Sequence, residues 1–176
     1  MKIIITAALI SISGLLATSI YTKTITTLGG TQISLAQYQG KKILMVNIAS
    51  ASEYAAVQIP QLQQLYQQYK DSLVVIAFAS NDFGKEPKSN TDLKLLLQNT
   101  YHIKFPVSVL STVKDGLATT HPVYKWLQNQ NENGSTSKKL AGDFVKYLID
   151  KDGSIIGVFG PSVKPMSAAI VTAITQ

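Results

Sequence analysis

The stretch Ile43–Ser52, ILMVNIASAS, decides the fold class of this chain. It begins as a short apolar run after two lysines and ends in small residues. Such a run is typical of a strand buried on both faces, as in a sheet covered by helices. Leu73–Phe78 is a second run of the same kind. Between the two runs, leucine and tyrosine recur at helical spacing after Pro60, which predicts a helix with this proline in its first turn.

Turn signals predict a hairpin on each side of this strand–helix–strand unit. Each hairpin consists of two short runs around a glycine-containing turn, which is a typical hairpin pattern. The runs and turns are Thr22–Thr27, Gly29-Gly30 and Thr31–Leu35 near the N-terminus, and Phe144–Ile149, Asp152-Gly153 and Ser154–Phe159 near the C-terminus.

Three further helices complete the predicted α/β fold. Thr91 is expected to cap one helix, His121–Gln128 forms a second, and Lys164-Pro165 opens a third. The polar segment Gln128–Ser137 is expected to be a loop without apolar anchors. Strands that alternate with helices, followed by a hairpin and a last helix, predict one domain with a central mixed sheet flanked by helices.

Composition excludes several classes of protein and site. The chain has 176 residues, of which 45% are hydrophobic and 15% charged, so it is not disordered. It contains no cysteine, which excludes disulfides, thiolate metal sites and a cysteine nucleophile. His102 and His121 are too few for a histidine-rich metal site, and G-x-G-x-x-G, G-K-[ST] and G-x-S-x-G motifs are absent. We expect neither a cofactor nor a metal.

The net charge of +6 comes from lysine alone, because the 16 basic residues include no arginine. Arginine is the side chain of bidentate phosphate and guanine recognition, so we expect no binding to nucleic acid. The lysines are interpreted as a solvated surface. A weak attraction to anionic membrane surfaces remains an alternative.

The N-terminal segment, residues 1–19, is interpreted as a targeting signal. Lys2 is followed by an apolar stretch from Ile3 to Ala17 that as a helix would reach about 22 Å, short of a ~30 Å hydrocarbon core. Ala17-Thr18-Ser19 has the small-x-small form of a cleavage site. We therefore predict an exported protein, periplasmic or secreted, whose domain is residues 20–176. The alternative is an N-terminal membrane anchor that is not cleaved.

Six stretches stand in order along the chain: ILMVNIASAS at 43–52, FASNDFGKEPKSN at 78–90, FPV at 105–107, HPVYKWL at 121–127, DFVKYLIDKDGSIIGVFGP at 143–161 and KP at 164–165. Taken together, these stretches resemble the glutathione peroxidase family, a branch of the thioredoxin fold. The resemblance runs from about Ser19 to the C-terminus and implies a thioredoxin-like sheet preceded by a β-hairpin.

The resemblance also assigns the family's catalytic positions, and all of them are replaced in this chain. The cysteine or selenocysteine nucleophile falls on Ser52, and the glutamine of N-Q-F-G falls on Asp82. The tryptophan and asparagine of W-N-F fall on Gly142 and Asp143. The resolving cysteine of short-form members falls near Gln98.

The resemblance implies hydroperoxide reduction by a thiol or selenol. The replacements at the catalytic positions argue against this activity. Serine cannot pass through a sulfenic acid, and nearby carboxylates disfavour an anionic nucleophile and anionic glutathione. Our main hypothesis is an exported, catalytically degenerate scaffold that binds a protein or small-molecule partner. The alternative is a glutathione or thioredoxin peroxidase of the oxidative-stress response whose catalytic residues are not identified.

Two other readings of the same residues are weaker. Ser52, Asp82 and Asp143 could suggest a hydrolase, but no histidine is placed to act as the base. Glu53, Asp82 and Asp143 could suggest a calcium site. The short loop after Gln128 resembles that of short-form members, which implies a monomer without a glutathione-specific pocket.

Overall fold

The computed structural model describes residues 17–176, so most of the expected targeting segment lies outside the described residues. Among the described residues, no helix has both the length and the apolar character needed to cross a bilayer. In chain order the elements are η1 (Ile20–Thr22), β1 (Thr24–Thr26), β2 (Gln32–Ser34), η2 (Leu35–Tyr38), β3 (Lys42–Ile48), α1 (Ala55–Gln68), β4 (Leu73–Ala79), α2 (Asn90–Asn99), β5 (Val107–Ser108), α3 (Pro122–Leu127), α4 (Gln130–Asn133), β6 (Lys146–Ile149), β7 (Ile155–Phe159) and α5 (Ala168–Thr175).

A five-stranded mixed sheet forms the centre of the molecule, in the order β5-β4-β3-β6-β7. The two apolar runs that the sequence marks as buried strands are β3 and β4, which pair in parallel with Ile43 opposite Val74. β5 is parallel to β4, whereas β6 and β7 are antiparallel to their neighbours. The predicted α/β class and mixed sheet are therefore confirmed.

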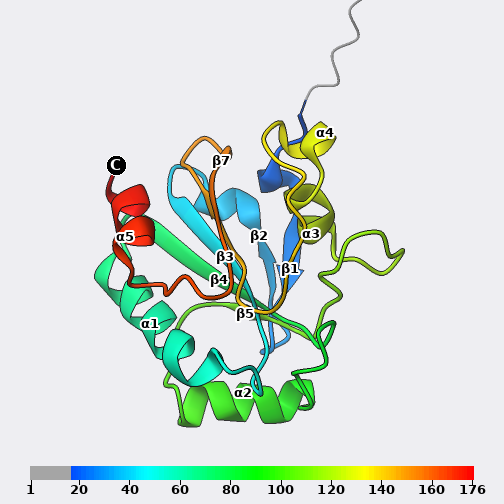
Figure 1. Ribbon diagram of the computed structural model, residues 1–176, viewed down its shortest axis with the longest axis vertical. Coiled ribbons are helices and arrows are strands. Elements are labelled where there is room, and N and C mark those ends of the chain that lie inside the picture. Colours follow the sequence, from blue (N-terminus) through cyan, green and yellow to red (C-terminus); the bar gives the residue numbers. More distant parts are fainter. Residues whose placement is uncertain (1–16) are drawn as a thin grey trace, which may run out of the picture.

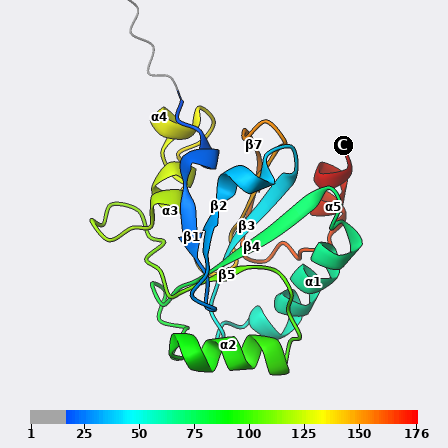
Figure 2. The same ribbon diagram turned by 180° about the vertical axis from the view of Figure 1, so that it is seen from behind.

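Each face of the sheet packs against its own layer, because alternate side chains of β3 point to opposite faces. Leu44 and Val46 belong to the core shared with α1 and α5. Ile43 and Met45 belong to the core on the other face, where Trp126 of α3 is 2% exposed. Figures 1 and 2 show α1 and α5 on one side of the sheet and α3 with the hairpin β1–β2 on the other.

The predicted N-terminal hairpin is present, and it covers the β5 edge of the sheet. β1 and β2 pair antiparallel, with Ile25 opposite Ile33. The Leu28 N–H donates to the Val107 carbonyl at 2.8 Å, and the Val109 N–H donates to the Thr26 carbonyl at 2.9 Å. These bonds use backbone groups that an open edge strand would leave unpaired.

Three predicted helix starts are wrong. Helix α5 begins at Ala168, after its cap Ser167, and not at Lys164-Pro165. Pro60 lies inside α1, which begins at Ala55, rather than in its first turn. The helix tolerates it although proline lacks the N–H that would bond to Ala56. Helix α2 is capped by Ser89, whose hydroxyl accepts from the Asp92 N–H at 3.2 Å, and Thr91 lies within the helix.

The polar segment after α3 is ordered by buried polar groups rather than by apolar anchors. Its residues 130–133 form α4, and Asn133 is 6% exposed. The Asn133 amide donates to the Trp126 carbonyl at 2.7 Å, and its oxygen accepts from the Thr136 N–H at 2.8 Å. The segment is therefore a fixed part of the fold, and the expectation of a plain loop is corrected.

The last residues of the expected cleavage site belong to the folded domain. The Thr18 N–H donates to the Glu132 carbonyl at 2.7 Å, and the Thr18 carbonyl accepts from the Trp126 indole N–H at 2.6 Å. Ser19 caps η1 through its hydroxyl. Removal of residues 1–19 would thus remove the partner of a buried indole.

Candidate active site

The candidate site lies where β3 ends and the chain turns into α1, and Asn47 joins this corner to a distant loop. Its amide donates to the Gly142 carbonyl at 3.0 Å, and its side-chain oxygen accepts from the Val145 N–H at 3.0 Å. The Phe144 N–H donates to the Asn47 carbonyl at 2.7 Å. These bonds to Asn47 therefore hold residues 142 and 143 next to the corner that contains Ser52.

Phe144 shows how tightly this loop is held. Its φ of 59° lies in the left-handed region, which costs a bulky residue about 1–3 kcal/mol. The ring is fully buried and packs edge-on to Tyr54, with a centroid distance of 6.2 Å. The packing and the bonds to Asn47 hold the strained backbone, and the next residue towards the N-terminus is Asp143.

A pocket of about 280 Å³ occupies the corner. Three of the four predicted site residues, Ser52, Gly142 and Asp143, line it together. The other lining residues are Glu53, Tyr54, Phe83, Lys85, Ala141 and Pro161.

Ser52 is 6% exposed, and its hydroxyl is only loosely bonded. Its Oγ lies 3.5 Å from Oε2 of Glu53 and accepts from the Tyr54 N–H at 3.5 Å. The Glu53 carboxylate is engaged by the Lys85 ammonium. That contact lowers the pKa of Glu53 and raises the pKa of Lys85. A carboxylate so paired is a weak base, so the structure gives Ser52 no activating partner.

Asp143 is the most perturbed group in the pocket. It is 4% exposed, and its Oδ1 atom has no hydrogen-bond partner. Burial raises its pKa from 3.8 to about 6; the neighbouring Lys85 opposes this rise, and the carboxylates of Glu53 and Glu86 add to it. A buried, unpaired carboxyl of this kind is able to donate or accept a hydrogen bond near neutral pH.

Asp82 does not share this pocket, which corrects the prediction for the fourth position. Its Oδ2 accepts from the backbone N–H groups of Val113 and Lys114, at 2.5 and 2.7 Å. The side chain thereby fixes the segment after β5 instead of facing Ser52. The carboxyl of Asp82 acts on the site only at a distance, by adding to the rise in the Asp143 pKa.

Glu86 is a site residue that the sequence reasoning missed. It is 2% exposed, and its carboxylate accepts from the Ser50 N–H at 2.6 Å and the Ser50 hydroxyl at 2.7 Å. Its own N–H donates to the Asn81 side chain at 2.9 Å. Glu86 thus clamps the loop that presents Ser52. A glutamate in a polar stretch gives no sequence signal of such burial.

Lys146 is a second missed residue, fully buried on β6. Its ammonium donates to the carbonyls of Pro161 at 3.3 Å and Val163 at 2.5 Å. Burial lowers its pKa to about 7. The Pro161 carbonyl also accepts from the Gln58 amide at 2.7 Å. These bonds position Pro161 on the wall of the pocket.

The two histidines lie away from Ser52. The His121 ring accepts from the Val123 N–H at 3.2 Å and packs edge-on to Phe78, and burial lowers its pKa. The His102 ring is bonded to the Gln98 carbonyl at 3.1 Å. A serine hydrolase needs a base beside its hydroxyl, so this geometry opposes that reading.

The acidic residues do not form a metal site either. Within residues 17–176, no three His, Cys, Asp or Glu side chains lie close enough together to hold a metal ion. The calcium reading fails because Asp82 faces the backbone after β5 and Glu53 is engaged by Lys85. Gln98 lies on a different, larger pocket, with Thr27 and Phe105 among its other lining residues.

Comparisons with known proteins find one family and one fold. A family model described as "Glutathione peroxidase" matches residues 20–128. A probable phospholipid hydroperoxide glutathione peroxidase of Mesembryanthemum crystallinum is 33% identical over 140 residues, which cover 78% of this chain and 81% of that protein.

Solved structures show the same fold. The apo form of Trgpx has a TM-score of 0.67 and 29% identity, over 92% of this chain and 98% of that one. A thioredoxin family protein from Chlorobium tepidum has a TM-score of 0.63 and 20% identity, over 90% and 94% of the two chains. The fold is therefore thioredoxin-like.

Proposed function

The chain belongs to the glutathione peroxidase family, and we propose that it is a member that keeps the scaffold as a binding protein without thiol-dependent peroxidase activity. The observation that carries this proposal is the hydroxyl of Ser52 at the corner between β3 and α1, in a chain with no cysteine. The partner is a protein or a small molecule. Export and a monomeric state, both expected from the sequence, remain part of the proposal.

The chemistry of the corner supports the loss of activity. Reduction of a hydroperoxide by a thiol enzyme breaks the O–O bond by attack of a thiolate, which becomes a sulfenic acid and is then reduced by another thiol. An alcohol is far less acidic than a thiol, and its oxygen has no corresponding oxidation step. The only sulfur in the chain belongs to three methionines.

The charges around Ser52 support it as well. Glu53 and Asp143 line the same pocket, and the ammonium of Lys85 is already engaged by Glu53. Carboxylates beside a nucleophile raise its pKa, and they repel an anionic reductant such as glutathione. The pocket is therefore unsuited to form a nucleophilic anion at residue 52.

A second candidate function is hydroperoxide reduction with glutathione or thioredoxin as the reductant. The names of the curated relatives favour it, since they describe probable glutathione peroxidases. It requires catalytic residues other than the four positions that the family resemblance assigns.

The experiment that separates the two candidates is a coupled peroxidase assay on the purified protein. Hydrogen peroxide and a lipid hydroperoxide are offered with glutathione or thioredoxin, and Ser52→Ala and heat-denatured protein serve as controls. We expect the native chain to match both controls. Sustained turnover above them would establish the second candidate and refute the first.

Ser52→Cys sharpens the same experiment. This variant restores the reactive atom but leaves Asp82, Gly142 and Asp143 in place, so we expect feeble turnover at most. Turnover comparable to that of an active family member would show that the other three positions matter little to the chemistry.

A further inference from the structure

A second pocket, larger than the one at Ser52, lies between the tip of the β1–β2 hairpin, helix α2 and the segment that leads into β5. Its volume is about 580 Å³, within the range of about 300–1,000 Å³ that is typical of sites for small molecules. The proposed function does not use it, and the family resemblance assigns a role to only one place on its wall, the position of the resolving cysteine near Gln98. Its lining residues are Thr27, Leu28, Gly29, Thr31, Ile33, Lys94, Leu97, Gln98, Ile103, Lys104, Phe105, Pro106 and Val107.

The walls of this pocket are fixed by bonds to the rest of the fold. The hairpin tip is attached to the sheet by the bond from Leu28 to Val107, at 2.8 Å. The opposite wall is held by the Lys104 N–H, which donates to the side-chain oxygen of Gln63 at 2.7 Å. A site that is already formed loses less free energy on binding than one that must first be ordered.

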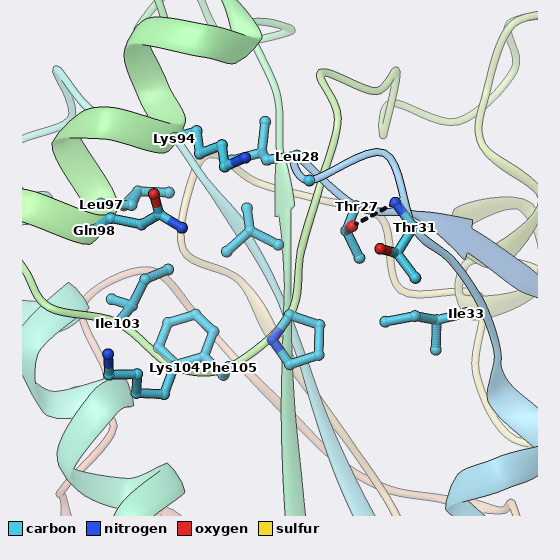
Figure 3. A pocket seen from close by; sticks show the side chains of 13 residues that line it. Thr27, Leu28, Thr31, Ile33, Lys94, Leu97, Gln98, Ile103, Lys104 and Phe105 are labelled. Carbon is cyan, nitrogen blue, oxygen red and sulfur yellow. Dashed lines mark hydrogen bonds between the residues drawn. The ribbon is translucent and has the colours of Figure 1, made fainter.

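The lining is apolar at its base and positive at its rim. Leu97 and Phe105 belong to the main hydrophobic core, and Ile103 packs against it. The lining includes two lysines and no acidic residue. Figure 3 shows Lys94 reaching from α2 towards Leu28.

The two lysines are free to meet a ligand. The ion pairs found within residues 17–176 use Lys42, Lys85 and Lys139. Lys94, which is half-buried, and Lys104, which is exposed, belong to none of these pairs. Neither charge is therefore neutralised by an acidic side chain of the described part of the chain. Charge complementarity therefore selects an anion.

The pocket is not a site for an added β-strand. The Val107 carbonyl accepts from Leu28, and residues 27 and 108 form an isolated bridge, so the hairpin already occupies the edge of β5. An extended peptide would find few backbone groups to pair with. The occupant must therefore be recognised by apolar contact and charge.

We propose that this pocket binds a soluble single-chain carboxylate, such as a medium-chain fatty acid. The alkyl chain lies on the half-buried side chains of Leu28 and Ile103, over a base formed by Leu97 and Phe105. The carboxylate sits in the positive potential of Lys94 and Lys104, and the Gln98 amide, which Figure 3 shows turned towards the centre of the pocket, offers a further hydrogen bond.

Calorimetric titration of the full chain with sodium decanoate, below its micelle concentration, tests this proposal. We expect saturable binding with a Kd on the order of 10–500 µM. Octanoate should bind more weakly by up to about 15-fold, because each buried methylene contributes up to about 4-fold. Decanol should bind at least about 10-fold more weakly than decanoate. No saturation at 2 mM decanoate, or equal affinity for decanol, would overturn the proposal.

Matched variants separate the pocket from the general positive surface. Lys94→Gln with Lys104→Gln should weaken decanoate binding about 10-fold or more, since a charge-assisted contact is lost at each residue. Lys151→Gln with Lys164→Gln removes the same charge from exposed positions elsewhere and should leave the Kd within 2-fold. Equal weakening by both pairs would mean that the net charge, and not the pocket, attracts the anion.

Two further arms locate the ligand. Gln98→Trp fills the pocket and should abolish decanoate binding although both lysines remain. If this variant does not fold, Thr31→Trp fills the pocket from the opposite wall and serves as the test in its place. Retained binding in a folded filling variant contradicts the proposed location. Binding to phosphatidylglycerol vesicles without binding to monomeric decanoate would indicate a membrane surface contact instead and would overturn the proposal.

Discussion

Asp143→Asn should make the protein more stable at neutral pH and should leave it unchanged in acid. The carboxyl is 4% exposed, and its Oδ1 atom has no partner, so the native state holds a charge that the unfolded chain would place in water. Burial raises its pKa from 3.8 to about 6. A rise of this size in the pKa corresponds to at most about 3 kcal/mol of unfolding free energy.

The sign of this effect follows from the direction of the shift. A carboxyl whose pKa is raised in the native state does not lower the unfolding free energy at pH values below its pKa in the unfolded chain. Above that pKa the unfolding free energy falls as the pH rises, until the native carboxyl has also ionised above about pH 6. We therefore expect Asp143→Asn to match the wild type near pH 3.5 and to exceed it by about 1–3 kcal/mol at pH 7.5. For a domain of this size, that corresponds to a rise in Tm of about 2–12 °C.

Urea unfolding at a series of pH values measures this difference. Asp152→Asn is the control of opposite sign, because hydrogen bonds from Ser154 hold the pKa of Asp152 below its usual value, so its replacement should lower stability at pH 7.5. A stability difference for Asp143→Asn that is the same at pH 3.5 and pH 7.5 would refute the role assigned to burial.

Two further predictions concern the positioning of the site and the start of the domain. Glu86→Gln should lower the unfolding free energy by about 1–3 kcal/mol, because it weakens two bonds to Ser50, whereas Ser52→Ala should change it by less than about 0.5 kcal/mol. Urea midpoints compare them, and equal losses would contradict the clamp. A chain that starts at residue 20 should melt at a lower temperature than one that starts at residue 18, because Thr18 accepts from the Trp126 indole. Equal Tm values in calorimetry would show that water replaces this contact.

The fold was predictable because the apolar residues of its central strands show in the sequence that these strands are buried. The run Ile43–Ile48 is apolar at every position except Asn47, which is typical of a strand covered on both faces. Helix starts were less predictable because they depend on which hydroxyl reaches a backbone N–H. Ser89 and Thr91 are chemically alike, and only the backbone decides that Ser89 is the cap of α2.

The part of the site that was predictable is the set of positions that the backbone of the fold brings together. Ser52 and Asp143 meet because Asn47 ties the two loops together, and both positions follow from the family resemblance. Asp82 was misplaced because its partners, the N–H groups of Val113 and Lys114, lie far along the chain. Glu86 was missed because a charged residue is rarely buried, and nothing in its local sequence shows its contact with Ser50.

The central claim is that residue 52 retains the position of the family's nucleophile without its redox chemistry. The most direct test counts the hydroperoxide molecules that each native chain consumes in the presence of excess thiol. We predict a count no greater than methionine oxidation explains, and the same count for Ser52→Ala. Many equivalents consumed per chain, lost on replacement of Ser52, would contradict the account.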